Sequence, residues 1–214
     1  MYQYIKYLLP NIISSLLILF SCCQVTADQI QLTLTPKSIP EPRMIVLRMY
    51  KKDDHQSIVA IIQESAYWLN GDRGALQQLE NSENCILVCT INNHVVGFII
   101  YTTYNNEMRL FGTIRYMAVT STCRYSGLGR ILLASALSHL ESFHVETVDL
   151  SVRADNERAI QFYESFGFRK MLNENGPSEW ITMSCIYENF APFAVLQSLA
   201  NLAAAATTKL EPQS

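Results

Sequence analysis

A glycine-containing turn between two regular segments is the strongest constraint in this sequence of 214 residues. The turn, Arg124 to Arg130, holds two glycines that are two positions apart. An apolar, strand-like run, Ile114 to Val119, precedes it, and a run with helical spacing of apolar residues, Leu128 to Leu140, follows it. Glycines let a ligand approach the backbone closely, and a helix N-terminus offers unpaired N–H groups. The turn is therefore predicted to hold an anion such as a pyrophosphate.

The spacing within the turn narrows the class of phosphate site. A Walker A loop needs Gly-Lys-Ser/Thr at its end, but Gly129 is followed by Arg130. A dinucleotide-binding fingerprint needs a third glycine at the position of Leu132. The pattern that fits is Arg/Gln-x-x-Gly-x-Gly/Ala, with Val119 five residues before Arg124. This spacing excludes a P-loop and disfavours a Rossmann site.

A second segment, Val148 to Phe168, has the signals of a strand followed by a short capped helix. Asn156 suits the N-cap, and Gly167 suits the left-handed residue that ends a helix. One face of this helix would carry Ala159, Ile160, Tyr163 and Phe166. Asn156 and Tyr163 are seven residues apart, almost two turns, so both are expected to contact one elongated ligand.

Together the two segments resemble the GNAT acetyltransferase superfamily, especially its ribosomal-protein alanine acetyltransferase branch. The resemblance covers roughly Met44 to Ile186, about two thirds of the chain. It implies an α+β fold: a GNAT-like mixed, mostly antiparallel central sheet with two splayed central strands, flanked by helices. The splayed strands would be Ile114 to Val119 and Val148 to Val152.

The resemblance also implies an activity, namely transfer of an acetyl group from acetyl-coenzyme A to a primary amine by direct attack. Tyr163 would be the catalytic acid that protonates the departing thiolate, and a backbone N–H near Val119 would stabilise the oxyanion. No metal is implied. The residues that the resemblance assigns to the coenzyme are Met117, Ala118, Val119, Arg124, Tyr125, Ser126, Gly127, Leu128, Gly129, Arg130, Asn156 and Ala159.

The general base is where this sequence departs from the similar branch. A glutamate often stands there at the position of Ser151, and a serine cannot take a proton unaided at neutral pH. Arg115 and Tyr116 fill the region of the preceding strand where many relatives place an acidic residue. An α-amine, with a reference pKa of about 8, needs less help to lose its proton than a lysine amine, with a reference pKa of about 10.4. The sequence therefore favours an N-terminal α-amine or a small amine as the acceptor.

Other interpretations stay open beside this one. A catalytically weak acyl-coenzyme A sensor is the main alternative, and an exported structural lipoprotein with a vestigial site is a third. Tyr163 alone suits a core aromatic, Asn156 a simple helix cap and Arg130 a surface arginine. Tyr67 and Trp68 either wall the acceptor site or pack in the core.

Composition agrees with a single globular domain carrying terminal extensions. The 214 residues are 49% hydrophobic and 16% charged, which suffices for one ordinary core. A net charge of -3 disfavours a nucleic-acid partner, because phosphate binding needs clustered lysine and arginine. The expected organisation is a signal-peptide-like or anchor segment at 1–27, a linker at 28–43, an acetyltransferase domain at 44–187 and a helical tail at 188–214.

The N-terminal segment has the features of an export signal. A largely apolar run, Ile12 to Cys23, precedes Val25-Thr26-Ala27, which has the small residues of a signal-peptidase site. Export or membrane attachment is therefore favoured. The cysteine spacings match neither a disulfide framework nor a zinc site, and acetyl-coenzyme A is a cytosolic metabolite. A cytoplasmic location follows instead if translation starts at Met44.

The remaining elements are predicted from hydrophobic period and turn residues. Asn92-Asn93 should form a hairpin turn, and Gly97 indicates close backbone packing or a bulge. Helices are expected after Asp53 or Asp54 and after Gly71, and over 191–209. Strands are expected at 44–49, 85–91, 94–103, 111–119, 148–152, 168–172 and 180–186.

Overall fold

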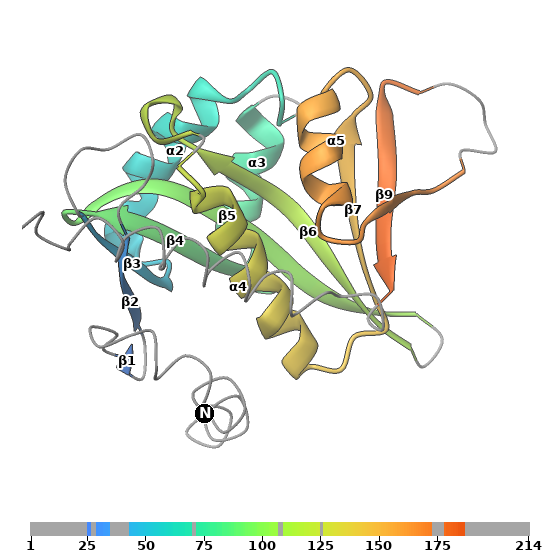
Figure 1. Ribbon diagram of the computed structural model, residues 1–214, viewed down its shortest axis with the longest axis horizontal. Coiled ribbons are helices and arrows are strands. Elements are labelled where there is room, and N and C mark those ends of the chain that lie inside the picture. The colour runs from blue at the N-terminus through green and yellow to red at the C-terminus, as the bar shows by residue number, and fades with distance from the viewer. Residues whose placement is uncertain are drawn as a thin grey trace, which may run out of the picture.

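The computed structural model describes residues 25–26, 29–34, 43–69, 72–106, 109–124, 126–172 and 178–186. They form one nine-stranded sheet with helices on both faces, in the strand order β1-β2-β3-β4-β5-β6-β7-β9-β8 (Figure 1). The strands are β1 (Val25–Thr26), β2 (Gln29–Leu34), β3 (Arg43–Met49), β4 (Cys85–Ile91), β5 (His94–Asn106), β6 (Arg109–Val119), β7 (Thr147–Arg153), β8 (Arg169–Lys170) and β9 (Trp180–Ile186). The α-helices are α2 (His55–Glu64), α3 (Asp72–Glu80), α4 (Leu128–Ser142) and α5 (Glu157–Glu164).

The sheet is mostly antiparallel, and the pair β6–β7 is parallel. A parallel pair needs a crossover, and α4 provides it. This mixed α+β architecture confirms the fold class predicted from the sequence. The β4–β5 hairpin is also confirmed, because Asn92 and Asn93 have positive φ angles of 50° and 65° at its turn.

Two strands, β1 and β2, lie where the sequence predicts the end of a leader and a linker. β2 pairs antiparallel with β3 over its whole length, from Gln29 opposite Arg48 to Leu34 opposite Arg43. β1 in turn pairs with β2. The first strand of the expected domain therefore has neighbours on both sides.

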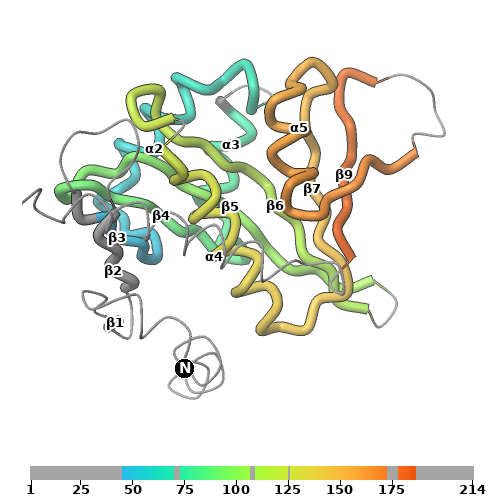
Figure 2. The backbone as a smooth tube through the Cα atoms, viewed as in Figure 1, coloured from blue at the N-terminus to red at the C-terminus, as the bar shows by residue number. Residues whose placement is uncertain are grey.

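Two apolar clusters cover opposite faces of the sheet. α4 and α5 lie on one face, and α2 and α3 lie on the other, as the path of the chain in Figure 2 shows. The first cluster includes Leu132 and Leu140 from α4 with Val148 from β7. The second includes Ile58 and Ile62 from α2. Apolar side chains that alternate along the central strands thus bury both faces, as helices on both sides require.

Both expectations for Gly97, close backbone packing and a bulge, are confirmed. A Cβ at this position would lie 3.1 Å from the carbonyl oxygen of Ala118 and 3.1 Å from Leu132 of α4, so β5 approaches β6 and α4 closely. The β4–β5 register also shifts between Cys89 and Thr90, next to this residue. A second shift lies between Ile100 and Tyr101 of β5 and leaves Arg115 of β6 as the extra residue.

Other predictions fall outside the described residues. These are residues 1–24 of the leader, Tyr125, the loop 173–177 and the helix expected at 191–209. Among the helices that the structure does describe, none combines the length and the apolar character needed to cross a membrane.

Candidate active site

The two central strands separate toward their C-terminal ends. β6 and β7 are paired from Phe111 opposite Thr147 to Ile114 opposite Leu150, and their ladder ends there. The last residues of β6 remain paired with β5, and β7 remains paired with β9 up to Arg153. Figure 1 shows β6 and β7 diverging from this point. The splay expected of these strands is therefore present, with the bulge at Arg115 next to its vertex.

The hydrogen-bond alternation of β6 decides which backbone groups face the gap. The amide of Thr120 donates to the carbonyl oxygen of Val96, so the pair Gly97–Val119 is a non-hydrogen-bonded pair. By the same alternation, the backbone groups of Met117 and Val119 point away from β5, toward the gap. Ala118 differs from its sequence-based assignment, since its backbone groups pair with Phe98 of β5.

The turn after β6 holds a helix N-terminus without a side-chain cap. Gly127 is the N-cap of α4 and has the left-handed φ of 90°, a conformation that favours glycine. Its carbonyl oxygen accepts from the amides of Arg130 and Ile131 at 3.0 and 3.2 Å. Within the described part of the chain, no acceptor bonds the amides of Leu128 or Gly129. The predicted anion site is thus open at the level of the backbone.

Helix α5 lies against this N-terminus. A Cβ on Gly129 would have the ring of Phe162 as its nearest neighbour, at 3.8 Å, so the protein itself leaves room there. Arg130 donates a 3.2 Å hydrogen bond from Nη2 to Oγ of Ser165, and its guanidinium lies 5.4 Å from the ring centroid of Phe166. The structure therefore brings the two sequence motifs together, and it places the Arg130 side chain on α5.

Tyr163 lies beside these contacts on α5. Its ring makes edge contacts with Phe162 and Phe168, at centroid distances of 5.2 and 5.8 Å. Burial raises the pKa of Tyr163 to about 12. Desolvation is the cause of this shift, and no hydrogen bond to a described residue contributes to it. The phenol is therefore protonated at neutral pH and available as a proton donor.

Asn156 is the side-chain cap of α5. Its Oδ1 accepts a 3.1 Å hydrogen bond from the amide of Ala159, so these two predicted coenzyme contacts satisfy each other. Gly167 has a φ of 91°, and the amides of Gly167 and Phe168 donate to the carbonyl oxygens of Glu164 and Tyr163. Both expected ends of this helix are confirmed.

The Arg124 side chain turns back onto the protein. Its Nε donates to the carbonyl oxygen of Val119 at 3.1 Å, and its Nη2 donates to Oγ of Ser65 at 3.3 Å and lies 3.5 Å from Oε1 of Glu64. Ser126 is buried, and its hydroxyl donates to the carbonyl oxygen of Cys123 at 2.5 Å. Sequence reasoning missed Glu64 and Ser65, because residues almost 60 positions away carry no local signal of this contact.

The opposite face of the sheet presents polar residues near the gap. Ser151 is exposed on β7 opposite Thr182 of β9, and no carboxylate stands in its place. Tyr67 and Trp68, in the α2–α3 connection, are 58% and 41% exposed, so neither is a core residue. Tyr67 contacts Asp155, which follows β7. These positions agree with the acceptor-side interpretation of Tyr67.

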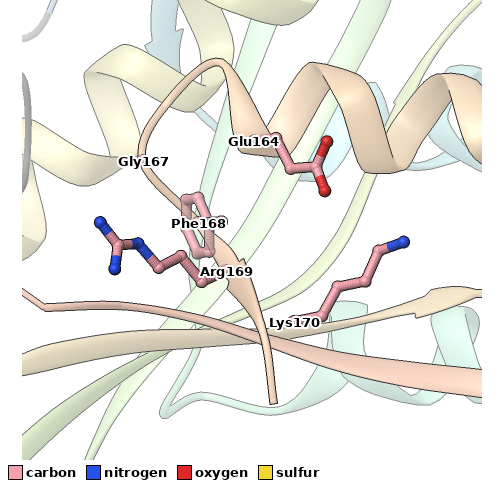
Figure 3. A pocket seen from close by; sticks show the side chains of 5 residues that line it. All are labelled: Glu164, Gly167, Phe168, Arg169 and Lys170. Atoms are coloured by element: carbon pink, nitrogen blue, oxygen red, sulfur yellow. The ribbon is translucent and has the colours of Figure 1, made fainter. Parts of the chain in front are cut away.

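A surface hollow of about 570 Å³ lies at the end of α5 (Figure 3). None of the residues assigned to the coenzyme or to proton transfer lines it. Its lining residues are Glu164, Gly167, Phe168, Arg169 and Lys170.

Comparison with known proteins agrees with this geometry. Over 84 residues, 39% of this chain and 54% of the relative, the chain is 37% identical to a [Ribosomal protein bS18]-alanine N-acetyltransferase of Salmonella typhimurium. Over 152 residues, 65% of this chain and 48% of the relative, it is 25% identical to a mycothiol acetyltransferase of Streptomyces coelicolor. The chain thus spans about half the length of these curated relatives.

A solved structure shows the same fold. The ribosomal-protein-S18-alanine N-acetyltransferase of Escherichia coli superposes with a TM-score of 0.55 at 24% identity, over 67% of this chain and 94% of that one. The model of the acetyltransferase (GNAT) family matches residues 46–168, which include the splayed strands, the glycine turn and α5. Because this match covers more than half of the sequence, the chain belongs to the GNAT acetyltransferase family.

Proposed function

We propose that this protein transfers the acetyl group of acetyl-coenzyme A to a primary amine, either a protein N-terminus or a small amine. The observation that carries the proposal is the meeting of the N-terminus of α4, which has no side-chain cap, with α5, on which burial keeps the Tyr163 hydroxyl protonated. Membership of the GNAT family indicates the class of reaction, and these residues would provide a binding site for the coenzyme and a proton donor.

The open backbone groups fit the coenzyme. Amides at the start of α4 would hold its pyrophosphate, because no described residue accepts a hydrogen bond from those of Leu128 and Gly129 and they lie at the positive end of the helix dipole. Backbone groups of Met117 and Val119 would bind the extended pantetheine arm as a neighbouring strand would. Gly129 supports this fit, since among the described residues the nearest atom to a Cβ placed there is 3.8 Å away, in the ring of Phe162.

The chemistry follows from the same residues. As the amine nitrogen replaces sulfur at the carbonyl carbon, the Tyr163 hydroxyl gives its proton to the leaving sulfur. The amine loses a proton to water, and water returns a proton to the phenolate. An N–H of Met117 or Val119 would donate to the carbonyl oxygen as negative charge develops on it. A pKa of about 12 keeps Tyr163 protonated until it is needed.

Ser151 supports an α-amine or small amine as the acceptor. It is exposed on the acceptor side and offers no carboxylate to take the proton of the attacking amine. At neutral pH an amine with a reference pKa of about 8 is already partly deprotonated, whereas a lysine amine is almost fully protonated. The same residue also favours the second candidate, an acyl-coenzyme A sensor with little turnover.

One experiment separates these candidates. The purified full-length chain is mixed with acetyl-coenzyme A and panels of N-terminal peptides, small amines and lysine peptides, and both thiol release and product mass are measured. Acetylated product would support the enzyme. Thermal stabilisation by acetyl-coenzyme A without any product would support the sensor. A folded chain with neither response would remove both.

The compartment stays a separate proposal, namely export or membrane attachment through residues 1–27. Mass spectrometry of the mature N-terminus in the native cell tests it. An intact N-terminus starting at residue 44 would favour the cytoplasm instead.

A further inference from the structure

Glu64, the last residue of α2, holds the point at which β6 passes into the coenzyme turn. Its Oε1 accepts a hydrogen bond from the amide of Ser121 at 2.6 Å, and its Oε2 accepts one from Oγ1 of Thr120 at 3.0 Å. Arg124 lies 3.5 Å from the same carboxylate. Both carboxylate oxygens are therefore engaged by three residues of the segment between β6 and the glycines.

Through this contact, a residue of α2 holds a segment that lies 57 positions later in the sequence. Ser121 begins the short 3₁₀-helix Ser121–Cys123, whose first amide has no acceptor in the helix itself. Hydrogen bonding by Ser121, with further contributions from Thr120 and the charge of Arg124, holds the pKa of Glu64 below its ordinary value. Glu64 is thus ionised at neutral pH, as a strong acceptor must be.

Arg124 connects the Glu64 carboxylate to the gap between β6 and β7. Its Nε bonds the carbonyl oxygen of Val119, the last residue of β6, while its Nη2 is near Glu64. The Glu64 carboxylate therefore orients the side chain of Arg124. Arg124 in turn donates a hydrogen bond to the carbonyl oxygen of Val119, a residue whose backbone faces the gap between β6 and β7. The N–H of Val119 is left for a ligand.

We propose that Glu64 is a positioning residue that presets the turn from Thr120 to Arg124, and through it the coenzyme-binding N-terminus of α4. This inference rests on the proposed function, because it concerns affinity for the same coenzyme. Glu64 itself touches no reacting atom in this proposal. Its loss should weaken coenzyme binding and leave the rate at saturation nearly unchanged.

Ser121→Pro removes both the amide and the hydroxyl through which Ser121 bonds Glu64. Proline lacks the N–H that donates to Glu64, and it is tolerated at the first position of a helix. The preceding Thr120 has φ −53° and ψ 146°, a conformation that a following proline allows. Glu64→Ala removes the acceptor from the other side. Together the two variants and their combination form a double-mutant cycle around the contact between Glu64 and Ser121.

Calorimetry with coenzyme A should show about tenfold or greater weakening for Ser121→Pro and for Glu64→Ala. The combined variant should bind no more weakly than the worse single variant, since both changes remove the same contact. At saturating acetyl-coenzyme A, kcat should stay within about twofold of the wild type while KM rises. Glu83→Gln is the control, because Glu83 is exposed and its backbone bonds Asn81 and Thr102, which are not part of the turn.

Wild-type affinity in either folded single variant would overturn the inference, and so would additive losses in the combined variant. A loss of kcat without a change in KM would also overturn it. If Glu64→Ala does not fold, as judged by its thermal unfolding, Ser121→Pro alone decides. Failure of the wild-type chain to bind coenzyme A is a different result, since it removes the proposed function as well.

Discussion

The hydroxyl of Tyr67 donates a 2.7 Å hydrogen bond to Oδ2 of Asp155, a residue 88 positions later. Nη2 of Arg153 donates to the same hydroxyl at 3.1 Å, and its guanidinium also bonds Asp155 at 3.0 Å. These bonds hold the pKa of Asp155 at about 2, with Arg153 as the largest cause. Since Glu64, three residues before Tyr67, contacts the end of β6, this short stretch joins the ends of both splayed strands.

Tyr67→Phe should raise KM for the acceptor by about three- to tenfold, because the acceptor-side wall loses its bonds to Asp155 and Arg153. The Kd for coenzyme A should not change. Steady-state kinetics at saturating acetyl-coenzyme A measure the first quantity, and calorimetry measures the second. Tyr50→Phe is a matched control, since its hydroxyl contacts His55 instead. An unchanged acceptor KM would show that this cluster is only structural.

Tyr163→Phe should lower kcat by about a hundredfold or more, because the variant lacks the proton donor and keeps the ring. Its melting temperature should not fall, since the pKa of Tyr163 is shifted by burial, without a hydrogen bond to a described residue. Rapid-quench measurement of product formation, together with coenzyme A binding, distinguishes the lost chemistry from lost binding. A variant with wild-type kcat would remove Tyr163 from the mechanism.

The glycines of the turn should respond differently to substitution. Gly129→Leu should leave the melting temperature close to wild type, because the nearest atom to its Cβ is 3.8 Å away, but should abolish coenzyme A binding. Gly129→Ala, which the motif itself permits, is the control and should bind. Gly127→Ala should instead destabilise the fold by about 1–2 kcal/mol, because Gly127 has a φ of 90°. Normal binding by Gly129→Leu would contradict the pyrophosphate site.

The pH dependence of kcat/KM should follow the acceptor and not Tyr163. Because burial raises the pKa of Tyr163 to about 12, the phenol stays protonated while acceptor amines titrate. The value of kcat/KM should therefore rise with pH, and the midpoint of the rise should lie at about 8 for an α-amine and at about 10.4 for a lysine amine. Profiles measured with an N-terminal peptide and a lysine peptide check this order. A falling limb between these two pH values would mean that another donor acts.

Ser151→Glu should raise kcat/KM at neutral pH by about tenfold, since it adds a carboxylate on the exposed acceptor face of β7. Ser151→Gln has a similar size without the charge and should show no gain. Product formation at a fixed, subsaturating acceptor concentration is sufficient to compare them. Equal rates for the three proteins would show that proton removal from the amine is not limiting.

Much of the fold was predictable because its signals are local. The paired asparagines at 92–93 specify a hairpin turn, and Asn156 and Gly167 specify the two ends of α5. The free backbone groups expected for Ala118 depend on information that is not local. Which backbone groups of β6 face the gap depends on its hydrogen-bond register with β5, and the sequence of β6 alone does not contain that register.

By itself, the sequence determined most of the elements from β3 onward, the glycine turn, the cap of α5 and the family, since each depends on residues within one turn, one strand or one short spacing. The tertiary structure decided where these elements meet. It set Phe162 against Gly129, buried Tyr163, and brought Glu64 onto Ser121 across 57 positions. The physical reason is that packing, burial and long-range hydrogen bonds depend on the folded arrangement of distant segments, which no local pattern specifies.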